Sequence, residues 1–163
     1  MKRILILRHA KSDWSDDNVD DKDRVLNYRG ENEAKITAKV MLQKNVSFDA
    51  IVSSPAARAL QTATIVKKIT NYPKEILVEE CFYFSDMRRI LAVIRRLDNQ
   101  VDNVLIVGHN PLWSNLVLLL AGKRMLMDTG CLAELVSDID SWEHFDTHQF
   151  TLQNYINPKE VKK

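Results

Sequence analysis

The stretch Ile4-Leu5-Ile6-Leu7-Arg8-His9 is the starting point for the fold of this chain. Four consecutive aliphatic residues without a helical period are typical of a buried strand, and two basic side chains follow where the apolar run stops. In an open α/β sheet, ligands bind beyond the carboxyl ends of the strands, where Arg8 and His9 would lie. The alternative is an edge strand followed by a solvated Arg-His pair. The remaining sequence has to distinguish a ligand site from such a solvated pair.

The composition is that of a soluble globular protein. The chain has 163 residues, of which 45% are hydrophobic and 28% charged, and we expect a single domain over residues 1–163. A formal net charge of +1 gives no reason to expect a nucleic acid or a membrane as partner. The first apolar run is too short for a signal peptide, and Cys81 and Cys131 make no disulfide framework. We therefore expect a cytoplasmic protein with ordinary thiols.

Strand and helix patterns alternate along the chain. Strands are expected at residues 4–7, 48–54, 76–78, 104–107, 127–136 and 150–155, and helices at 27–44, 56–70, 86–97 and 112–121. This alternation predicts a three-layer α/β/α sandwich with a mostly parallel central sheet and helices on both faces. Asn27 is a plausible N-cap of the first helix. The polar, Asp-rich segment 11–23 is expected to be a long solvated loop.

Polar side chains follow three of the expected strands. Arg8 and His9 follow the first, Ser53-Ser54-Pro55 and Arg58 follow the second, and Gly108-His109-Asn110 follows the fourth. Because the carboxyl ends of parallel strands lie at one edge of a sheet, we expect these groups to converge. Two arginines and two histidines near helix N-termini suit an anionic tetrahedral group, since the guanidinium fork matches phosphate oxygens. Two histidines without a third ligand do not predict a metal site.

These stretches resemble the histidine phosphatase superfamily. Leu7-Arg8-His9-Ala10 is similar to its Arg-His-Gly/Ala signature, residues 53–63 (SSPAARALQTA) to its second motif, and residues 107–111 (VGHNP) to its third. Residues 24–30 (RVLNYRG) and 127–130 (MDTG) resemble the small SixA-like branch of phosphohistidine phosphatases. The resemblance implies a phosphoglycerate mutase-like fold and a metal-independent phosphatase without a cofactor.

The resemblance also implies roles for individual residues. His9 would attack phosphorus and form a phosphohistidine intermediate, which water then hydrolyses. Arg8, Arg58 and His109 would bind the nonbridging oxygens and stabilise charge in the transition state. Arg24 would reach the same phosphate or a neighbouring group of the substrate. Surrounding cations would lower the pKa of His9 and so favour the neutral, nucleophilic imidazole.

Other candidate residues carry more than one interpretation. Asn27 is a candidate substrate-binding residue, and Ser54 is a candidate partner of the residues that bind phosphate. Larger members of the superfamily have an acidic proton donor, and Glu80, beside Glu79, lies in the corresponding region; the alternative is that both carboxylates are solvated. A phosphoramidate such as phosphohistidine would need no strong internal acid, because its imidazole leaving group is less basic than an alkoxide.

Three functions remain to be compared. The first is hydrolysis of phosphohistidine in a phosphorylated protein, which an open pocket favours because we see no long insertion that could close over a small molecule. The second is hydrolysis of a small phosphate ester at the same site. The third is a noncatalytic phosphate-binding regulatory module, which would be favoured by the loss of His9 or His109, and both are present.

Overall fold

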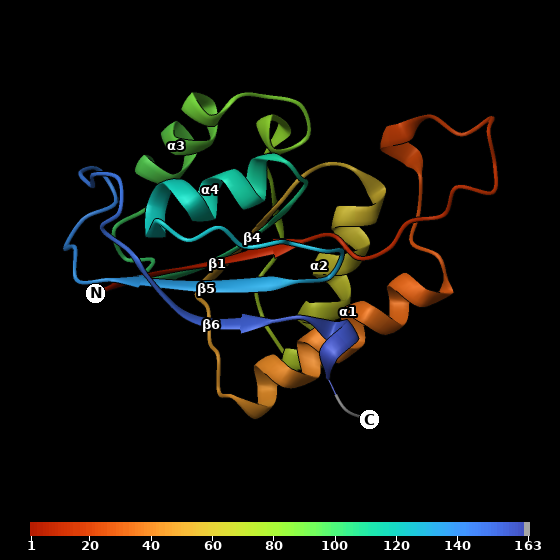
Figure 1. Cartoon of the computed structure of the whole chain (residues 1–163), viewed down its shortest axis with the longest axis horizontal. Helices are drawn as coiled ribbons and strands as arrows, with labels where there is room; N and C mark the ends of the chain where they lie inside the picture. The colour runs from red at the N-terminus through yellow and green to blue at the C-terminus, as the bar shows by residue number, and fades with distance from the viewer. Residues whose placement is uncertain (162–163) are drawn as a thin grey trace.

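The structure is a computed structural model, which describes residues 1–161. A six-stranded sheet forms its centre, with the strand order β3-β2-β4-β1-β5-β6 (Figure 1). The strands are β1 (Lys2–Arg8), β2 (Ala50–Ser53), β3 (Leu77–Val78), β4 (Asn103–Gly108), β5 (Leu132–Ser137) and β6 (Thr151–Ile156). The first four are parallel to one another, while β5 is antiparallel to both β1 and β6. The expected mostly parallel α/β sheet is therefore confirmed.

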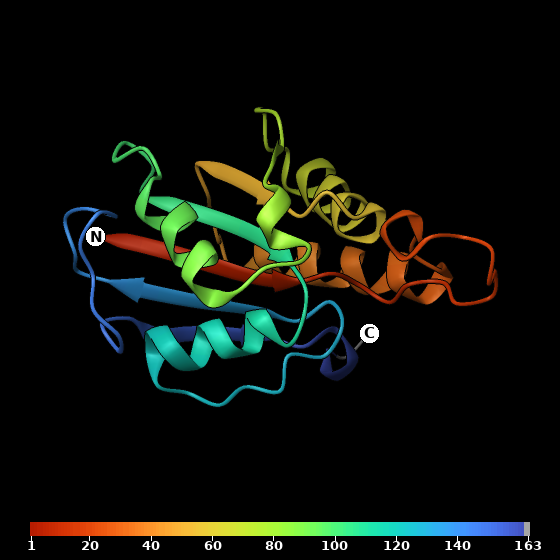
Figure 2. The same ribbon diagram turned by 90° about the horizontal axis from the view of Figure 1, so that it is seen from above.

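Helices cover both faces of the sheet (Figure 2). They are α1 (Tyr28–Gln43), α2 (Ala57–Thr70), α3 (Met87–Arg95) and α4 (Leu112–Ala121), with short 3-10 turns at Asp21–Asp23, Glu80–Phe82 and Pro158–Glu160. Helices α1 and α2 pack on one face, and α3 and α4 pack on the other. Among the helices of residues 1–161, none combines the length and the apolar character needed to cross a membrane.

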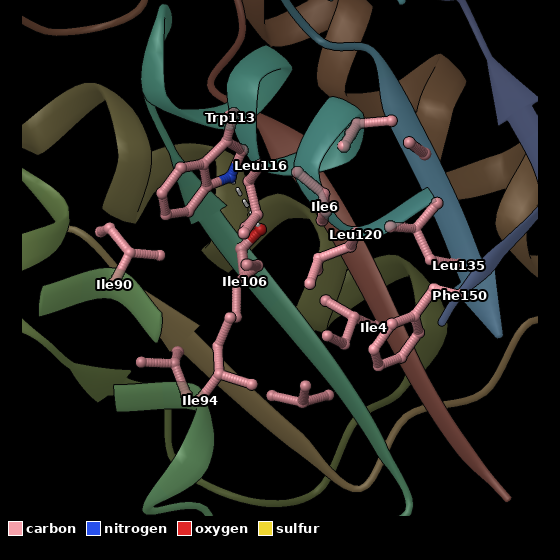
Figure 3. Close-up of a cluster of buried hydrophobic side chains, with 14 of the residues drawn as sticks. Ile4, Ile6, Ile90, Ile94, Ile106, Trp113, Leu116, Leu120, Leu135 and Phe150 are labelled. Atoms are coloured by element: carbon pink, nitrogen blue, oxygen red, sulfur yellow. Dashed lines mark hydrogen bonds between the residues drawn. The ribbon is translucent and has the colours of Figure 1, made fainter. Parts of the chain in front are cut away.

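The bare aliphatic run of β1 is explained by burial on two sides. Ile4 and Ile6 pack in the core under α3 and α4, whereas Leu5 and Leu7 pack in the core under α1 and α2. All four side chains are fully buried. Figure 3 shows the first of these cores, in which Trp113 donates a hydrogen bond from its indole to a backbone carbonyl of β4, at 3.3 Å. A strand buried on both faces needs apolar side chains at every position, so it shows no alternation.

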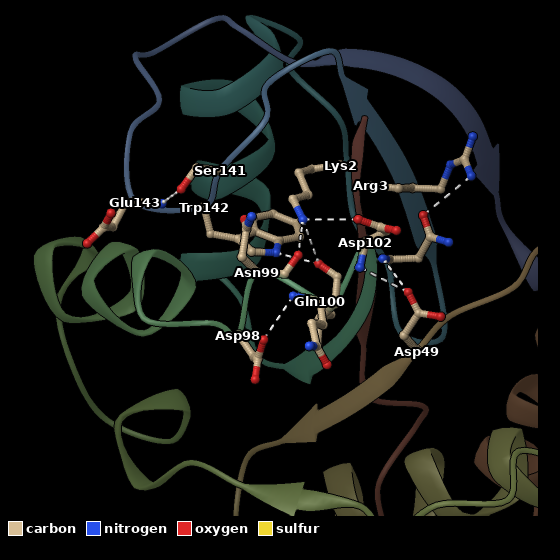
Figure 4. Close-up of polar contacts among 12 residues, drawn as sticks. Lys2, Arg3, Asp49, Asp98, Asn99, Gln100, Asp102, Ser141, Trp142 and Glu143 are labelled. Atoms are coloured by element: carbon tan, nitrogen blue, oxygen red, sulfur yellow. Dashed lines mark hydrogen bonds and ion pairs between the residues drawn. The ribbon is translucent and has the colours of Figure 1, made fainter.

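The end of the sheet where β1 begins is closed by a polar cluster (Figure 4). The Lys2 side chain is almost fully buried, and its Nζ donates to the carbonyl oxygens of Asn99 and Val101, at 2.6 and 3.1 Å. Nζ also pairs with the Asp102 carboxylate at 3.0 Å and lies 5.6 Å from the centre of the Trp142 ring. These contacts hold the loops at this end of the sheet against β1. The opposite, carboxyl end of β1 takes no part in this cluster.

The predicted bounds of β2 and β5 differ from the observed ones. A strand was expected at residues 48–54, but β2 extends only from Ala50 to Ser53. A strand was also expected at 127–136, but β5 begins at Leu132, because residues 127–131 wrap around the end of β1 as a loop. In that loop the Met127 carbonyl accepts from the Arg8 guanidinium at 2.9 Å, and the Gly130 N–H donates to the His9 carbonyl at 3.0 Å. Met127 and Cys131 are buried against the core. The predicted start of this strand at Met127 is therefore wrong, because residues 127–131 form a loop bonded to Arg8 and His9.

Candidate active site

A pocket of about 540 Å³ opens beyond the carboxyl ends of β1 and β4. Arg8, His9, Arg58 and His109, the main site residues predicted from the sequence, all line it, and so does Arg24. Arg8 ends β1, His109 follows β4, and Arg58 is the second residue of α2. The expectation that three strand ends converge is therefore met by the geometry.

Close packing of the two strand ends brings the histidines together. Arg8 pairs with Gly108 across β1 and β4, and the His9 N–H donates to the Gly108 carbonyl at 3.0 Å. A Cβ atom on Gly108 would lie 2.6 Å from the ring of Trp113, so only glycine fits at this position. The His9 and His109 rings consequently lie 5.0 Å apart between their centroids.

The hydrogen bonding of His9 defines its tautomer. Its Nδ1 lies 2.7 Å from the carbonyl oxygen of Ala10, which can only accept, so Nδ1 carries the hydrogen and Nε2 keeps its lone pair. Burial, reinforced by the nearby His109, Arg58 and Arg8, lowers the pKa of His9 to about 3, although the bond to Ala10 acts in the opposite direction. A neutral imidazole with a free Nε2 is the form that can attack phosphorus.

His109 is held by Ser54, at the start of the segment that leads into α2. Its Nε2 lies 2.8 Å from the Ser54 hydroxyl oxygen, which also accepts from the Ala56 N–H at 3.1 Å. Burial, together with the positive charges of Arg58 and Arg8, lowers the pKa of His109 to about 4. Ser54 therefore fixes the orientation of a second neutral imidazole in the pocket.

Unpartnered hydrogen-bond donors gather around the pocket. Within residues 1–161, the buried side-chain atoms without a hydrogen-bond partner are the Nε atoms of Arg3, Arg8, Arg24 and Arg58 and the hydroxyl of Ser85. The Arg3 Nε is compensated by a carboxylate 3.0 Å away, and the other four residues all line the pocket. Because buried donors are normally paired, this concentration indicates a site that a bound anion would complete.

Asp21 is a component of the site that the sequence analysis missed. Its carboxylate accepts from the Tyr83 hydroxyl at 2.7 Å, from Arg24 Nη2 at 2.7 Å and from Arg58 Nη2 at 3.0 Å. Burial opposes ionisation, but the hydrogen bonds from Tyr83, Arg24 and Arg58 outweigh it and hold the pKa of Asp21 well below its usual range. The acidic segment is exposed, as expected, but this one carboxylate also has three hydrogen-bond partners in the protein, with its side chain 46% exposed. The only signal in the sequence was an aspartate three residues before an arginine.

The pocket mouth carries exposed aromatic side chains. Trp14 is 72% exposed and stacks on Arg24, whose guanidinium carbon lies 3.4 Å from the ring centre. Phe84 is 75% exposed and lies 4.2 Å from the Tyr83 ring, which in turn lies 5.7 Å from that of His109. Trp14 and Phe84, which we call the aromatic rim, both line the pocket. They offer apolar contacts to a substrate beyond its phosphoryl group.

Two other candidate residues do not reach the pocket. The Asn27 Oδ1 accepts from the Gly30 N–H at 2.8 Å, so this side chain caps α1, as the sequence predicted, and is not available as a substrate ligand. The Glu80 side chain is 77% exposed and its carboxylate lies 3.7 Å from Lys22. The 3-10 turn at this position directs Phe82 into the core and leaves Glu80 in solvent. The expectation of a proton donor at Glu80 is therefore not supported by the geometry.

Comparison with known proteins identifies the family. Residues 4–82 match the family model of the histidine phosphatase superfamily, branch 1. An uncharacterised protein of Mycobacterium tuberculosis is 32% identical over 115 residues, which make up 71% of this chain and 70% of that protein. The chain belongs to the histidine phosphatase superfamily. Membership, together with the site geometry, identifies it as a phosphatase.

Within the superfamily, this phosphatase is similar to SixA proteins. Phosphohistidine phosphatase SixA of Escherichia coli is 29% identical over 117 residues, or 71% of each chain. A SixA structure complexed with tungstate superimposes with a TM-score of 0.85 at 26% identity, covering 98% of this chain and 99% of the other. A protein of Agrobacterium tumefaciens, provisionally assigned as SixA, gives 0.83 at 28% identity over 96% and 98% of the two chains. The fold is thus SixA-like and phosphoglycerate mutase-like.

Proposed function

We propose that this phosphatase removes the phosphoryl group from a phosphohistidine side chain of another protein, through a covalent intermediate on His9. The observation that carries the proposal is the tautomer of His9. Its Nδ1 is committed to the Ala10 carbonyl, and its Nε2 is unprotonated in a pocket lined by arginines. A neutral nucleophile beside fixed positive charge is the arrangement that phosphoryl transfer requires.

In the first step, His9 Nε2 forms a bond to phosphorus while the bond from phosphorus to the substrate nitrogen breaks. The electron pair of the broken bond stays on the departing nitrogen, and a proton on the other ring nitrogen makes the departing imidazole neutral. Arg8, Arg58 and His109 hold the nonbridging oxygens, with Arg24 at the edge of the same group. These arginines supply the positive charge of the site, so the proposed reaction has no step on a metal ion or an organic cofactor.

In the second step, water attacks the phosphorus of phospho-His9. The bond to Nε2 breaks, its electron pair returns to Nε2, and inorganic phosphate leaves with the oxygen and the protons of the water. The Ala10 carbonyl keeps the hydrogen on Nδ1 throughout, so Nε2 is the nitrogen regenerated at the end of the cycle.

The substrate assignment is supported by the chemistry of the pocket wall. Among the described residues that line it there is no aspartate or glutamate. An alkyl ester would need a proton donor for its leaving oxygen, whereas an imidazole that is already protonated leaves without one. The exposed aromatic rim suits a flat leaving group presented by a protein surface. The name and the bound tungstate of the SixA relatives agree with a phosphohistidine substrate and a tetrahedral oxyanion.

The test compares kcat/KM on three phosphoryl donors at pH 7 in the presence of EDTA. The donors are a phosphohistidine carrier protein, phosphoramidate, and p-nitrophenyl phosphate. We expect the carrier protein to be the best substrate, EDTA to have no effect, and His9→Ala to abolish turnover of all three. Preference for the aryl ester would instead support a small-molecule phosphomonoesterase. Phosphate binding without turnover of any donor would support a noncatalytic binding module.

A further inference from the structure

Asp21 accepts hydrogen bonds from two arginines of the pocket. Arg58 uses its two terminal nitrogens on this residue, with Nη1 donating to the backbone carbonyl at 2.7 Å and Nη2 to Oδ2 at 3.0 Å. Arg24 donates from Nη2 to Oδ1 at 2.7 Å and from Nη1 to the hydroxyl of Ser12. In both guanidinium groups the two terminal nitrogens, which we call the outer fork, are therefore already hydrogen-bonded to other residues of the protein.

The occupied fork leaves the other edge of each guanidinium free. A guanidinium group can bind an anion by its two terminal nitrogens or by one terminal nitrogen together with Nε. In Arg24 and Arg58 the Nε atoms are buried and unpartnered, while only 6% of Arg58 and 8% of Arg24 is exposed. These side chains are fixed in place, and the edge that carries Nε is the one that remains for a ligand.

We propose that Asp21 is a positioning residue, which holds Arg24 and Arg58 by their outer forks so that their Nε edges face the phosphoryl group. The inference rests on the proposed function, because it assumes that these arginines bind the transferred group. It adds a carboxylate that never touches the substrate. Tyr83 supports the arrangement, since its hydroxyl donates to Oδ2 of Asp21 and its ring packs against His109.

Electrostatics and positioning make opposite predictions for the loss of this carboxylate. Asp21 is a negative charge close to a phosphate site, so by charge alone its removal would tighten the binding of an anion. If its main role is to orient two guanidinium groups, its removal would weaken anion binding, because both arginines would lose their fixed geometry. The sign of the change therefore separates the two explanations.

The experiment measures the dissociation constant of inorganic phosphate by calorimetry for Asp21→Asn, with Asp20→Asn and Asp23→Asn as matched controls. Asp20 and Asp23 are exposed neighbours in the same segment, and each control removes the same charge. We expect Asp21→Asn to weaken phosphate binding about 10-fold or more, because both arginines lose a charge-assisted hydrogen bond that orients them. The controls should leave binding unchanged or slightly tighter. Equal or tighter binding by folded Asp21→Asn overturns the proposal.

A second variant covers the case in which Asp21→Asn does not fold. Tyr83→Phe keeps the ring and every charge and removes one hydrogen bond to the carboxylate, so we expect a smaller loss, about 2- to 5-fold, in the same direction. Unchanged phosphate binding by both variants rejects the inference. If Asp21→Asn does not fold, unchanged phosphate binding by Tyr83→Phe alone rejects it. Phosphate binding requires no turnover, so the result is independent of whether the wild-type protein forms phospho-His9. The experiment therefore distinguishes a failure of this inference from a failure of the proposed function.

Discussion

Both histidines of the pocket should remain uncharged at pH values at which an ordinary histidine is already protonated. With a pKa of about 3, His9 would be roughly 1% protonated at pH 5, and His109, with a pKa of about 4, roughly 10%. A histidine with the usual pKa of ~6.5 would be roughly 97% protonated at the same pH. The difference arises mainly from burial, because the charged imidazolium loses hydration in the pocket.

Nitrogen-detected NMR of the imidazole side chains measures this directly. Between pH 8 and pH 5, the His9 signals should stay those of a neutral ring with hydrogen on Nδ1 and a bare Nε2. Free histidine added to the same sample provides reference signals for an ordinary imidazole. Movement of the His9 signals to those of an imidazolium between pH 7 and pH 6, or a neutral ring with hydrogen on Nε2, would refute the argument from burial and from the Ala10 carbonyl.

The same shifts affect stability in a defined direction. The unfolded chain binds protons on both histidines near pH ~6.5, whereas the folded protein binds them only near pH 3 to 4. The unfolded state therefore binds more protons in this window, and the free energy of unfolding falls as the pH decreases through it. By pH 5 the loss is about 2 kcal/mol for each histidine. Urea unfolding at pH 7 and pH 5 should show a smaller difference in His9→Ala than in the wild type.

Three substitutions test separate parts of the structure. Gly30→Ala should destabilise the protein by about 3 kcal/mol or prevent folding, because the new Cβ would lie 1.9 Å from the Lys11 carbonyl oxygen; a normal urea midpoint would contradict the packing. Lys2→Ala should lower the free energy of unfolding by about 2–3 kcal/mol without changing KM, since the ammonium is buried at the end of the sheet opposite the site. Ser54→Ala should lower kcat about 2- to 10-fold through loss of the bond to His109, with little change in melting temperature; an unchanged kcat would remove Ser54 from the site.

The parts of the site that the sequence predicted are those that follow a buried strand directly. The aliphatic runs of β1 and β4 indicate burial on both faces, and this places Arg8, His9 and His109 at the carboxyl edge of the sheet. Arg58 follows because its helix starts just beyond β2, the neighbour of β4. In these cases the position in the fold is fixed by a pattern within a few residues of the functional side chain.

The parts that the sequence could not predict depend on contacts between distant segments. Asp21 looks like its solvated neighbours until Tyr83, 62 residues later, and Arg58 are brought beside it. The same limit explains Glu80, whose direction is set by a 3-10 turn rather than by the strand before it. It also explains residues 127–131, whose hydrogen bonds with Arg8 and His9 form a loop around the end of β1 instead of extending β5. Tertiary contacts, not local propensity, decide all three.

The measurement that tests the central claim most directly is the isolation of the phosphorylated protein. Brief reaction with a phosphohistidine donor, an alkaline quench that preserves phosphoramidates, and peptide mass spectrometry would locate the phosphoryl group. Nε2 attack predicts one phosphoryl group on His9, with its phosphorus signal assigned to Nε2, and none in His9→Ala. Turnover without a phosphorylated His9, or with the phosphoryl group on another residue, would contradict the account.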